Sequence, residues 1–90
     1  MRRSPEEFGD EVLELVHISR TLREAGRVES LLTEHGTDYA VTADRYHATF
    51  LLFFPTQRVG AFFYVRVTEA AACRELLERQ RFQVVPSPDE

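Results

Sequence analysis

Two aromatic runs constrain this chain more than any other feature. Residues 49–54 read TFLLFF and residues 61–67 read AFFYVRV, and the segment between them begins with Pro55 and ends with Gly60. Runs of this kind, bounded by Pro and Gly, are typical of the two strands of a β-hairpin. Side chains alternate between the faces of a strand, and here both faces are apolar. The second face therefore has to be covered by a helix, another subunit or a ligand.

An amphipathic helix is predicted after a first strand at residues 12–18. Thr21 and Glu24 have the spacing of a capping box, and apolar residues then recur every three or four positions. Gly36 is placed to end this helix in a left-handed conformation. Gly26 lies inside it, which indicates a close approach of the helix to the sheet.

The remaining elements complete an α+β chain. They are a strand at residues 39–43, a polar connection at 44–47, a helix from Glu69 to about Gln80 that Thr68 caps, and a last strand at 82–85. This order predicts a ferredoxin-like split β-α-β plait with a mostly antiparallel sheet, one extra strand and both helices on one face. We expect a single domain at residues 12–86, between a flexible N-terminal tail at 1–11 and a C-terminal tail at 87–90.

Length and charge limit the partners of the chain. With 90 residues it forms one domain with a thin stability margin, which oligomerisation widens. A net charge of −4 disfavours binding to nucleic acid or to an anionic membrane. Residues 58–65 partly resemble an RNA-recognition strand, but the paired aromatic positions do not align. No apolar stretch is long enough to span a membrane and no signal core follows the N-terminus, so we expect a cytoplasmic, bacterial protein.

The aromatic runs also predict a homodimer. In a plait both helices cover the same face of the sheet, so the other face carries part of the aromatic set. An exposed apolar patch of this kind marks an interface. We therefore expect two copies to pack sheet face to sheet face through Phe50, Leu52, Phe54, Phe62 and Tyr64.

Reactive residues are few. The single cysteine, Cys73, excludes an internal disulfide and a cysteine-based zinc cluster, and its place on an apolar helix face predicts a buried, inert thiol. The absence of lysine excludes Schiff-base chemistry. The three histidines lack metal-ligand spacing, so neither a metal nor a cofactor is predicted.

One polar cluster has the composition of a ligand site. An arginine can bind an anion through two parallel hydrogen bonds, and a tyrosine ring can form the wall of a small-molecule pocket. The predicted site for a small anionic ligand consists of Asp44, Arg45, Tyr46 and His47, joined by Arg58 and Arg66. The alternative is a solvated loop without a ligand.

About half of the chain resembles a known family. Ser19-Arg20, Glu24-Ala25, residues 28–32 and residues 35–41, and more weakly Gly60 and residues 70–77, are similar to the small bacterial domains classed as prokaryotic signal-transducing proteins. The resemblance implies a ferredoxin-like fold, self-association and a regulatory or binding role, with no catalytic residues to carry over. The aromatic hairpin and the polar segment 44–47 depart from the family pattern.

The sequence leaves three functions open. The first is a non-enzymatic regulatory or small-ligand-binding module that acts as a homodimer. The second is a small dimeric plait-type enzyme, with His17, His47 or Tyr64 as acid–base groups in a cleft between sheet and loops. The third is an interaction module whose apolar face docks on another protein.

Overall fold

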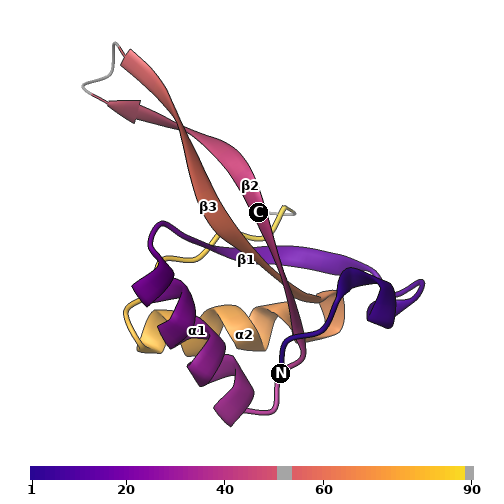
Figure 1. The fold of residues 1–90 in the computed structure, drawn as a ribbon. Coiled ribbons are helices and arrows are strands. Elements are labelled where there is room, and N and C mark those ends of the chain that lie inside the picture. Colours follow the sequence, from indigo (N-terminus) through magenta and orange to yellow (C-terminus); the bar gives the residue numbers. More distant parts are fainter. Residues whose placement is uncertain (51–53, 89–90) are drawn as a thin grey trace.

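The chain forms three strands and two helices, with a short 3-10 helix near the N-terminus (Figure 1). This computed structural model describes residues 1–50 and 54–88, of which 46–50 and 54–58 are described by their backbone alone. The elements are η1 (Pro5–Phe8), β1 (Leu13–Ser19), α1 (Leu22–Glu34), β2 (Tyr39–Phe50), β3 (Phe54–Arg66) and α2 (Val67–Arg79). The class is α+β, as the sequence predicts.

The sheet is antiparallel, with β3 between β1 and β2. Because both outer strands run antiparallel to β3, they run parallel to each other, and α1 connects them. Both helices contribute to one core on one face of the sheet. Val28 and Leu32 of α1 and Leu77 of α2 meet Phe63 and Val65 of β3 there, and all five are fully buried. Each such side chain stabilises the fold by about 1.5–3 kcal/mol.

The extra strand that the sequence predicts is absent from the described residues. Residues 39–43 and 49–54 were expected as two strands, but β2 runs without a break through the polar segment 44–47. Each residue of that segment pairs with a residue of β3, from Asp44 opposite Gly60 to His47 opposite Gln57. Polar residues are compatible with an extended backbone wherever a strand remains uncovered. The prediction of an extra strand was therefore wrong, because the polar segment 44–47 was interpreted as a connection between two strands.

The two aromatic runs are also not partners along their length. Residues 61–65 pair with residues 39–43, whereas Phe50 pairs with Phe54. The segment from Pro55 to Gly60, expected as the hairpin loop, belongs to β3. This register places Phe50 and Phe54, the described ends of β2 and β3, opposite each other at the far end of the hairpin, and residues 51–53 of the first aromatic run lie outside the described residues.

Two local signals at α1 were interpreted correctly, the cap at Thr21 and the end at Gly36. The backbone N–H of Glu24 donates to Thr21 Oγ1 at 3.1 Å, and Gly36 follows the helix with φ +69°. The second helix starts earlier than expected, because α2 begins at Val67 with Arg66 as its N-cap and Thr68 lies inside it.

A β-bulge in β1 changes which side chains reach the core. Leu15 lies opposite Tyr64 and His17 opposite Phe63, so Val16 is an extra residue between two successive pairs. Val16 and His17 are both fully buried. Simple alternation predicts opposite faces for these two neighbours, and the bulge removes that alternation.

The N-terminal segment lies against the sheet. The backbone N–H of Arg3 donates to the Tyr39 carbonyl at 2.8 Å, and the ring of Phe8, which is buried, lies 5.0 Å from the Arg66 guanidinium. These contacts hold part of the segment expected as a flexible tail.

Neither helix of the described residues has the length and apolarity needed to cross a bilayer.

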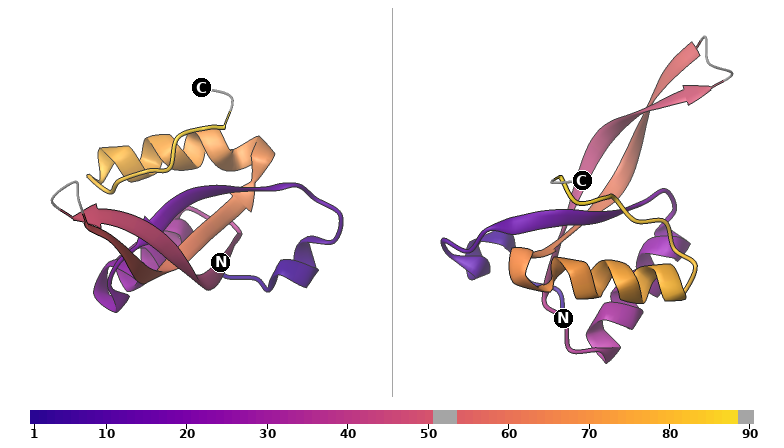
Figure 2. Two further views of the ribbon diagram at one scale, coloured as in Figure 1. Left: turned by 90° about the horizontal axis from the view of Figure 1, so that it is seen from above. Right: turned by 180° about the vertical axis from the view of Figure 1, so that it is seen from behind.

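The C-terminal segment runs beside β1 (Figure 2). The N–H of Val85 donates to the Val16 carbonyl at 2.8 Å, on the edge of β1 that β3 does not occupy. Residues 82–85, expected as a strand, form no named strand of the sheet.

Candidate functional site

A two-stranded arm extends from the body of the molecule. The last pair between β1 and β3 joins Ser19 and Ala61, but β2 and β3 continue for seven more pairs, from Asp44–Gly60 to Phe50–Phe54. At about 3.4 Å per residue these pairs span about 24 Å. We call residues 44–50 and 54–60 the hairpin arm. Figures 1 and 2 show it projecting away from both helices.

An apolar hollow of about 260 Å³ lies where the arm leaves the body. Its walls include residues from the start of α1 and from both strands of the arm base: Thr21, Leu22, Val41, Ala43, Val59 and Ala61. Two of these are large and unusually exposed, because Leu22 is 92% and Val59 is 64% accessible to solvent. We call this feature the arm-base hollow. Exposed apolar side chains around a hollow are typical of a contact surface.

Most of the predicted ligand residues lie on the arm. Asp44 and Arg45 are exposed at its base, and the Arg45 N–H donates to Asp44 Oδ1 at 2.7 Å. The backbone register places Tyr46 opposite Arg58. The side chains of Tyr46, His47 and Arg58 lie outside the described residues.

Arg66 does not join that cluster. It follows Arg58 by eight residues along β3, which corresponds to about 27 Å. Its guanidinium binds Glu11 at 2.6 Å, Asp38 at 3.3 Å and Glu69 at 3.4 Å. The hydrogen bond with Glu11 is the main cause that raises the pKa of Arg66. The structure therefore gives Arg66 a role in joining elements.

The predicted interface residues fall in two places. Phe62 and Tyr64 alternate with the core residues Phe63 and Val65, so they lie on the sheet face opposite the helices. Phe62 is buried and Tyr64 half-buried within the single chain. Phe50 and Phe54 form the last described pair of the arm, where only their backbone is described. Leu52 lies outside the described residues.

The contacts of His17 with Ser19, Glu24 and Gln83 form a buried cluster that was not predicted from the sequence. His17 Nδ1 lies 2.6 Å from the Gln83 carbonyl oxygen, and Nε2 lies 2.8 Å from Ser19 Oγ and 3.4 Å from Glu24 Oε1. Since a carbonyl only accepts, Nδ1 carries the proton that it donates to Gln83. The ring also packs at 5.7 Å from that of Phe63. The only sequence signal was the alternate spacing of His17 and Ser19.

This cluster lacks the order of a hydrolytic triad. In a triad the acid holds one imidazole nitrogen and the nucleophile faces the other. Here Ser19 and Glu24 approach the same nitrogen, and His17 and Ser19 are buried. The arrangement joins β1 to α1 and to the C-terminal segment.

The remaining reactive groups are the buried Cys73 thiol and the possible metal-binding side chains. Burial raises the pKa of the Cys73 thiol to about 11, as expected for an inert cysteine. Among the side chains that the structure describes, no three His, Cys, Asp or Glu groups gather closely enough to hold a metal ion.

Comparisons with known proteins return no relative for this chain. No family model and no curated protein matches the sequence, and no solved structure matches the fold. The resemblance to prokaryotic signal-transducing proteins stays a prediction, so a functional proposal has to rest on the arm and its surroundings.

Proposed function

We propose that this chain is a non-enzymatic interaction module that acts as a homodimer joined through its hairpin arms. The observation that carries the proposal is the arm-base hollow, with the exposed side chains of Leu22 and Val59, at the foot of a projecting arm. The other end of the arm is uncharged, since residues 48–55 read ATFLLFFP. An apolar segment and an apolar hollow are complementary, and both belong to the same chain.

Two copies satisfy both features at once. If two arms lie side by side in opposite directions, the end of each arm reaches the base of the other. This arrangement has two-fold symmetry, in which the same surface is used by both partners. A two-stranded hairpin is at best marginally stable alone in water, so a second ribbon beside it stabilises the arm. Asp44 and Arg45 at each base add charges of both signs.

The interface proposed here differs from the sheet-face dimer suggested by the sequence. Phe62 is already buried within one chain, and Phe8 covers part of the molecule beside Arg66. Less apolar area thus remains on that face than the sequence implied, whereas the hollow at the arm base remains open. The arm is therefore the better interface.

The enzyme alternative receives less support. His17, its first acid–base candidate, is fully buried, with both ring nitrogens in structural contacts. A general base has to reach a proton of the substrate. The buried position of His17 favours a binding role over catalysis.

A plait remains our proposal for the fold. The Val85–Val16 hydrogen bond lays residues 82–85 beside β1, so the spatial order is C-terminal segment, β1, β3, β2. With β1 and β2 parallel around β3, this is the order of a split β-α-β plait whose last strand is reduced to one backbone contact. The regulatory role implied by the family resemblance is compatible with a dimeric plait.

Light scattering on the full chain tests the dimer. We expect twice the mass of one chain at tens of micromolar concentration. Leu22→Glu should give the monomer mass, because it places a charge in the arm-base hollow at a side chain whose loss leaves the core intact. Val12→Glu is the matched control, since Val12 is 71% exposed and lies outside the arm. A monomeric parent chain, or a dimer in Leu22→Glu, would refute the proposed interface.

A shortened arm provides a second test. Residues 46–58 are replaced by Asn-Gly, which favours a tight hairpin turn. The buried core cluster contains no residue of the removed segment among those described. We expect a cooperatively unfolding monomer, and a shortened chain that still forms dimers would contradict the proposal.

A further inference from the structure

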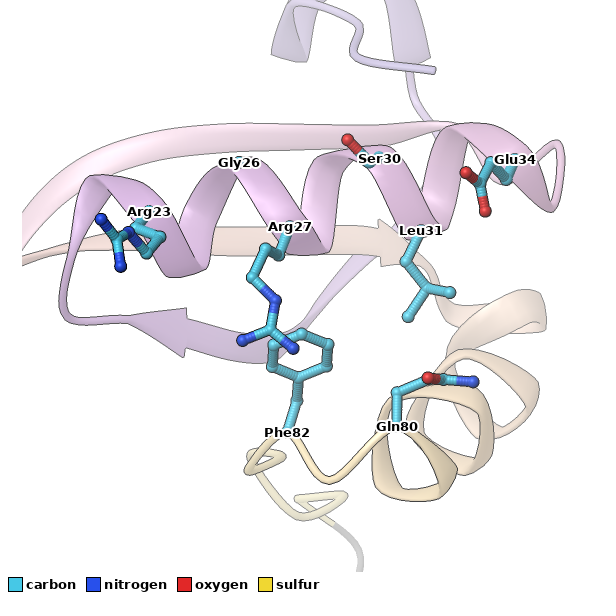
Figure 3. A pocket seen from close by; sticks show the side chains of 8 residues that line it. All are labelled: Arg23, Gly26, Arg27, Ser30, Leu31, Glu34, Gln80 and Phe82. Carbon is cyan, nitrogen blue, oxygen red and sulfur yellow. The ribbon is translucent and has the colours of Figure 1, made fainter.

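A second surface, on the side of α1, has the composition of an anion site. Arg23, Gly26, Arg27, Ser30, Leu31 and Glu34 form one stripe along α1, and Gln80 and Phe82 face them from the turn after α2 (Figure 3). These residues line a groove of about 410 Å³, a size within the range of small-molecule sites. We call it the α1 groove. It lies apart from the hairpin arm, and the proposed dimer does not use it.

The cations of the groove are not neutralised. Arg2, Arg3, Arg66 and Arg74 each bind a carboxylate, yet in the part of the chain that the structure describes no carboxylate lies within 4.0 Å of Arg23 or Arg27. The two arginines are four residues apart on one helix, a spacing at which like charges repel. In a chain of net charge −4, two arginines one helical turn apart with no carboxylate partner favour an anionic ligand.

Arg27 is held in a binding geometry. Its guanidinium carbon lies over the Phe82 ring, 5.1 Å from the ring centre (Figure 3). A cation–π contact of this kind restrains the position of the group while leaving N–H donors available. A guanidinium in this state is suited to two parallel hydrogen bonds with a phosphate.

The floor of the groove depends on Gly26. A Cβ atom built there meets no other atom within 4 Å, so the position is open space and not a contact with the sheet. The close helix–sheet approach that the sequence suggested at Gly26 was therefore wrong. A glycine costs helix stability in this place, and the absence of its side chain is what leaves the groove open.

We propose that the α1 groove binds a small phosphorylated molecule. Arg23 and Arg27 hold the phosphate, and Ser30 and Gln80 supply further hydrogen-bonding groups along the groove. Glu34 lies seven residues beyond Arg27, about 10 Å along the helix axis. A carboxylate only accepts hydrogen bonds, so the far end of the ligand carries a hydroxyl or amino group.

A titration followed by amide NMR at low salt tests this site. Ribose 5-phosphate is the probe and ribose is its uncharged control. We expect saturable shifts at residues 23–34 and 80–82 with the phosphate ester and none with ribose. Absence of saturable shifts at millimolar probe, or equal shifts with ribose, would overturn the proposal.

Charge variants distinguish binding in the α1 groove from nonspecific electrostatic attraction of the probe to the protein. Arg27→Gln should weaken binding at least about tenfold, which corresponds to ~1.4 kcal/mol. Arg79→Gln removes the same charge from α2 outside the α1 groove, and it should leave the affinity within about twofold, or ~0.4 kcal/mol. Equal losses in both variants would mean that no site exists.

A variant that fills the groove tests the site without destabilising the fold. Gly26→Leu places a good helix former in open space, so the urea midpoint of unfolding should rise. The same side chain occupies the groove, so binding of ribose 5-phosphate should be lost. A more stable protein that still binds the probe as tightly as the parent would overturn the assignment of this groove.

Discussion

His17 shows how a polar side chain becomes part of an apolar core. Both ring nitrogens have partners, the Gln83 carbonyl and the Ser19 hydroxyl, and within the described residues no buried side-chain nitrogen or oxygen lacks one. Replacing only one member of such a pair leaves the other buried without a hydrogen bond, which costs about 1–3 kcal/mol.

We therefore expect His17→Phe to lower the free energy of unfolding, measured by urea denaturation, by about 1–3 kcal/mol. The double variant His17→Phe, Ser19→Ala should recover part of this loss, because it also removes the unpaired hydroxyl. If the double variant is less stable than the sum of the two single changes predicts, the Ser19 contact does not have this role.

Cys73 is the clearest agreement between sequence and structure. The apolar side of its helix predicts burial, and burial raises the pKa of its thiol to about 11. At pH 8 only about one thiol in a thousand would then be ionised. We expect Ellman's reagent to label native protein at least about a hundredfold more slowly than protein in denaturing urea. Rapid labelling of the native protein would show that Cys73 is exposed in solution.

Arg74 of α2 is one of the residues that attach the C-terminal segment. Its Nε donates to the Val85 carbonyl at 2.6 Å and an Nη donates to the Leu15 carbonyl at 3.0 Å, while Glu14 forms an ion pair with it. The side chains of Arg74 and Glu14 are only 11% and 16% exposed. One guanidinium thus connects α2, β1 and the segment beside β1.

Arg74→Met should destabilise the fold strongly, since it leaves Glu14 as a nearly buried, unpaired charge. We expect a loss at the lower end of about 3–5 kcal/mol in urea denaturation. Adding Glu14→Gln should recover part of it, and hydrogen exchange should show early loss of protection at Val85. Unchanged exchange at Val85 in Arg74→Met would show that other contacts hold the segment.

The helix α1 and the strands β1 and β2 show which features of secondary structure a local sequence pattern predicts. The capping of α1 by Thr21 and its end at Gly36 were predicted because each depends on a few neighbouring residues. The length of β2 was not predicted, because the polar residues from Asp44 to His47 belong to the strand through their pairing with β3. The bulge at Val16 likewise depends on the partner strand.

Asp38 joins several distant parts of the molecule. Its carboxylate lies 3.3 Å from Arg66 at the end of β3, 3.4 Å from Arg3 and 3.8 Å from the N-terminal amine. Desolvation opposes ionisation here, but the hydrogen bonds and charges of Arg66 and Arg3 outweigh it and lower the pKa of Asp38 from its ordinary value of 3.8.

A lowered pKa in the folded state gives a defined pH dependence. The ionised carboxylate stabilises the fold above about pH 4, and this contribution is lost as the pH falls through the lowered pKa. In urea denaturation the wild type should therefore exceed Asp38→Asn in stability at pH 7 and pH 5, and the two should converge as the pH falls below about 4. A difference that stays constant down to the lowest pH would show that Asp38 has no such role.

For the molecule as a whole, the sequence determined the α+β class, the place of α1 and the burial of Cys73. These follow from periodicity, capping and composition, which act between residues a few positions apart. The tertiary structure decided the register of the hairpin, the separation of Arg66 from Arg58, the burial of His17 and the opening beside Gly26. Each of these depends on which distant segment lies opposite, and a local pattern carries no information about that partner.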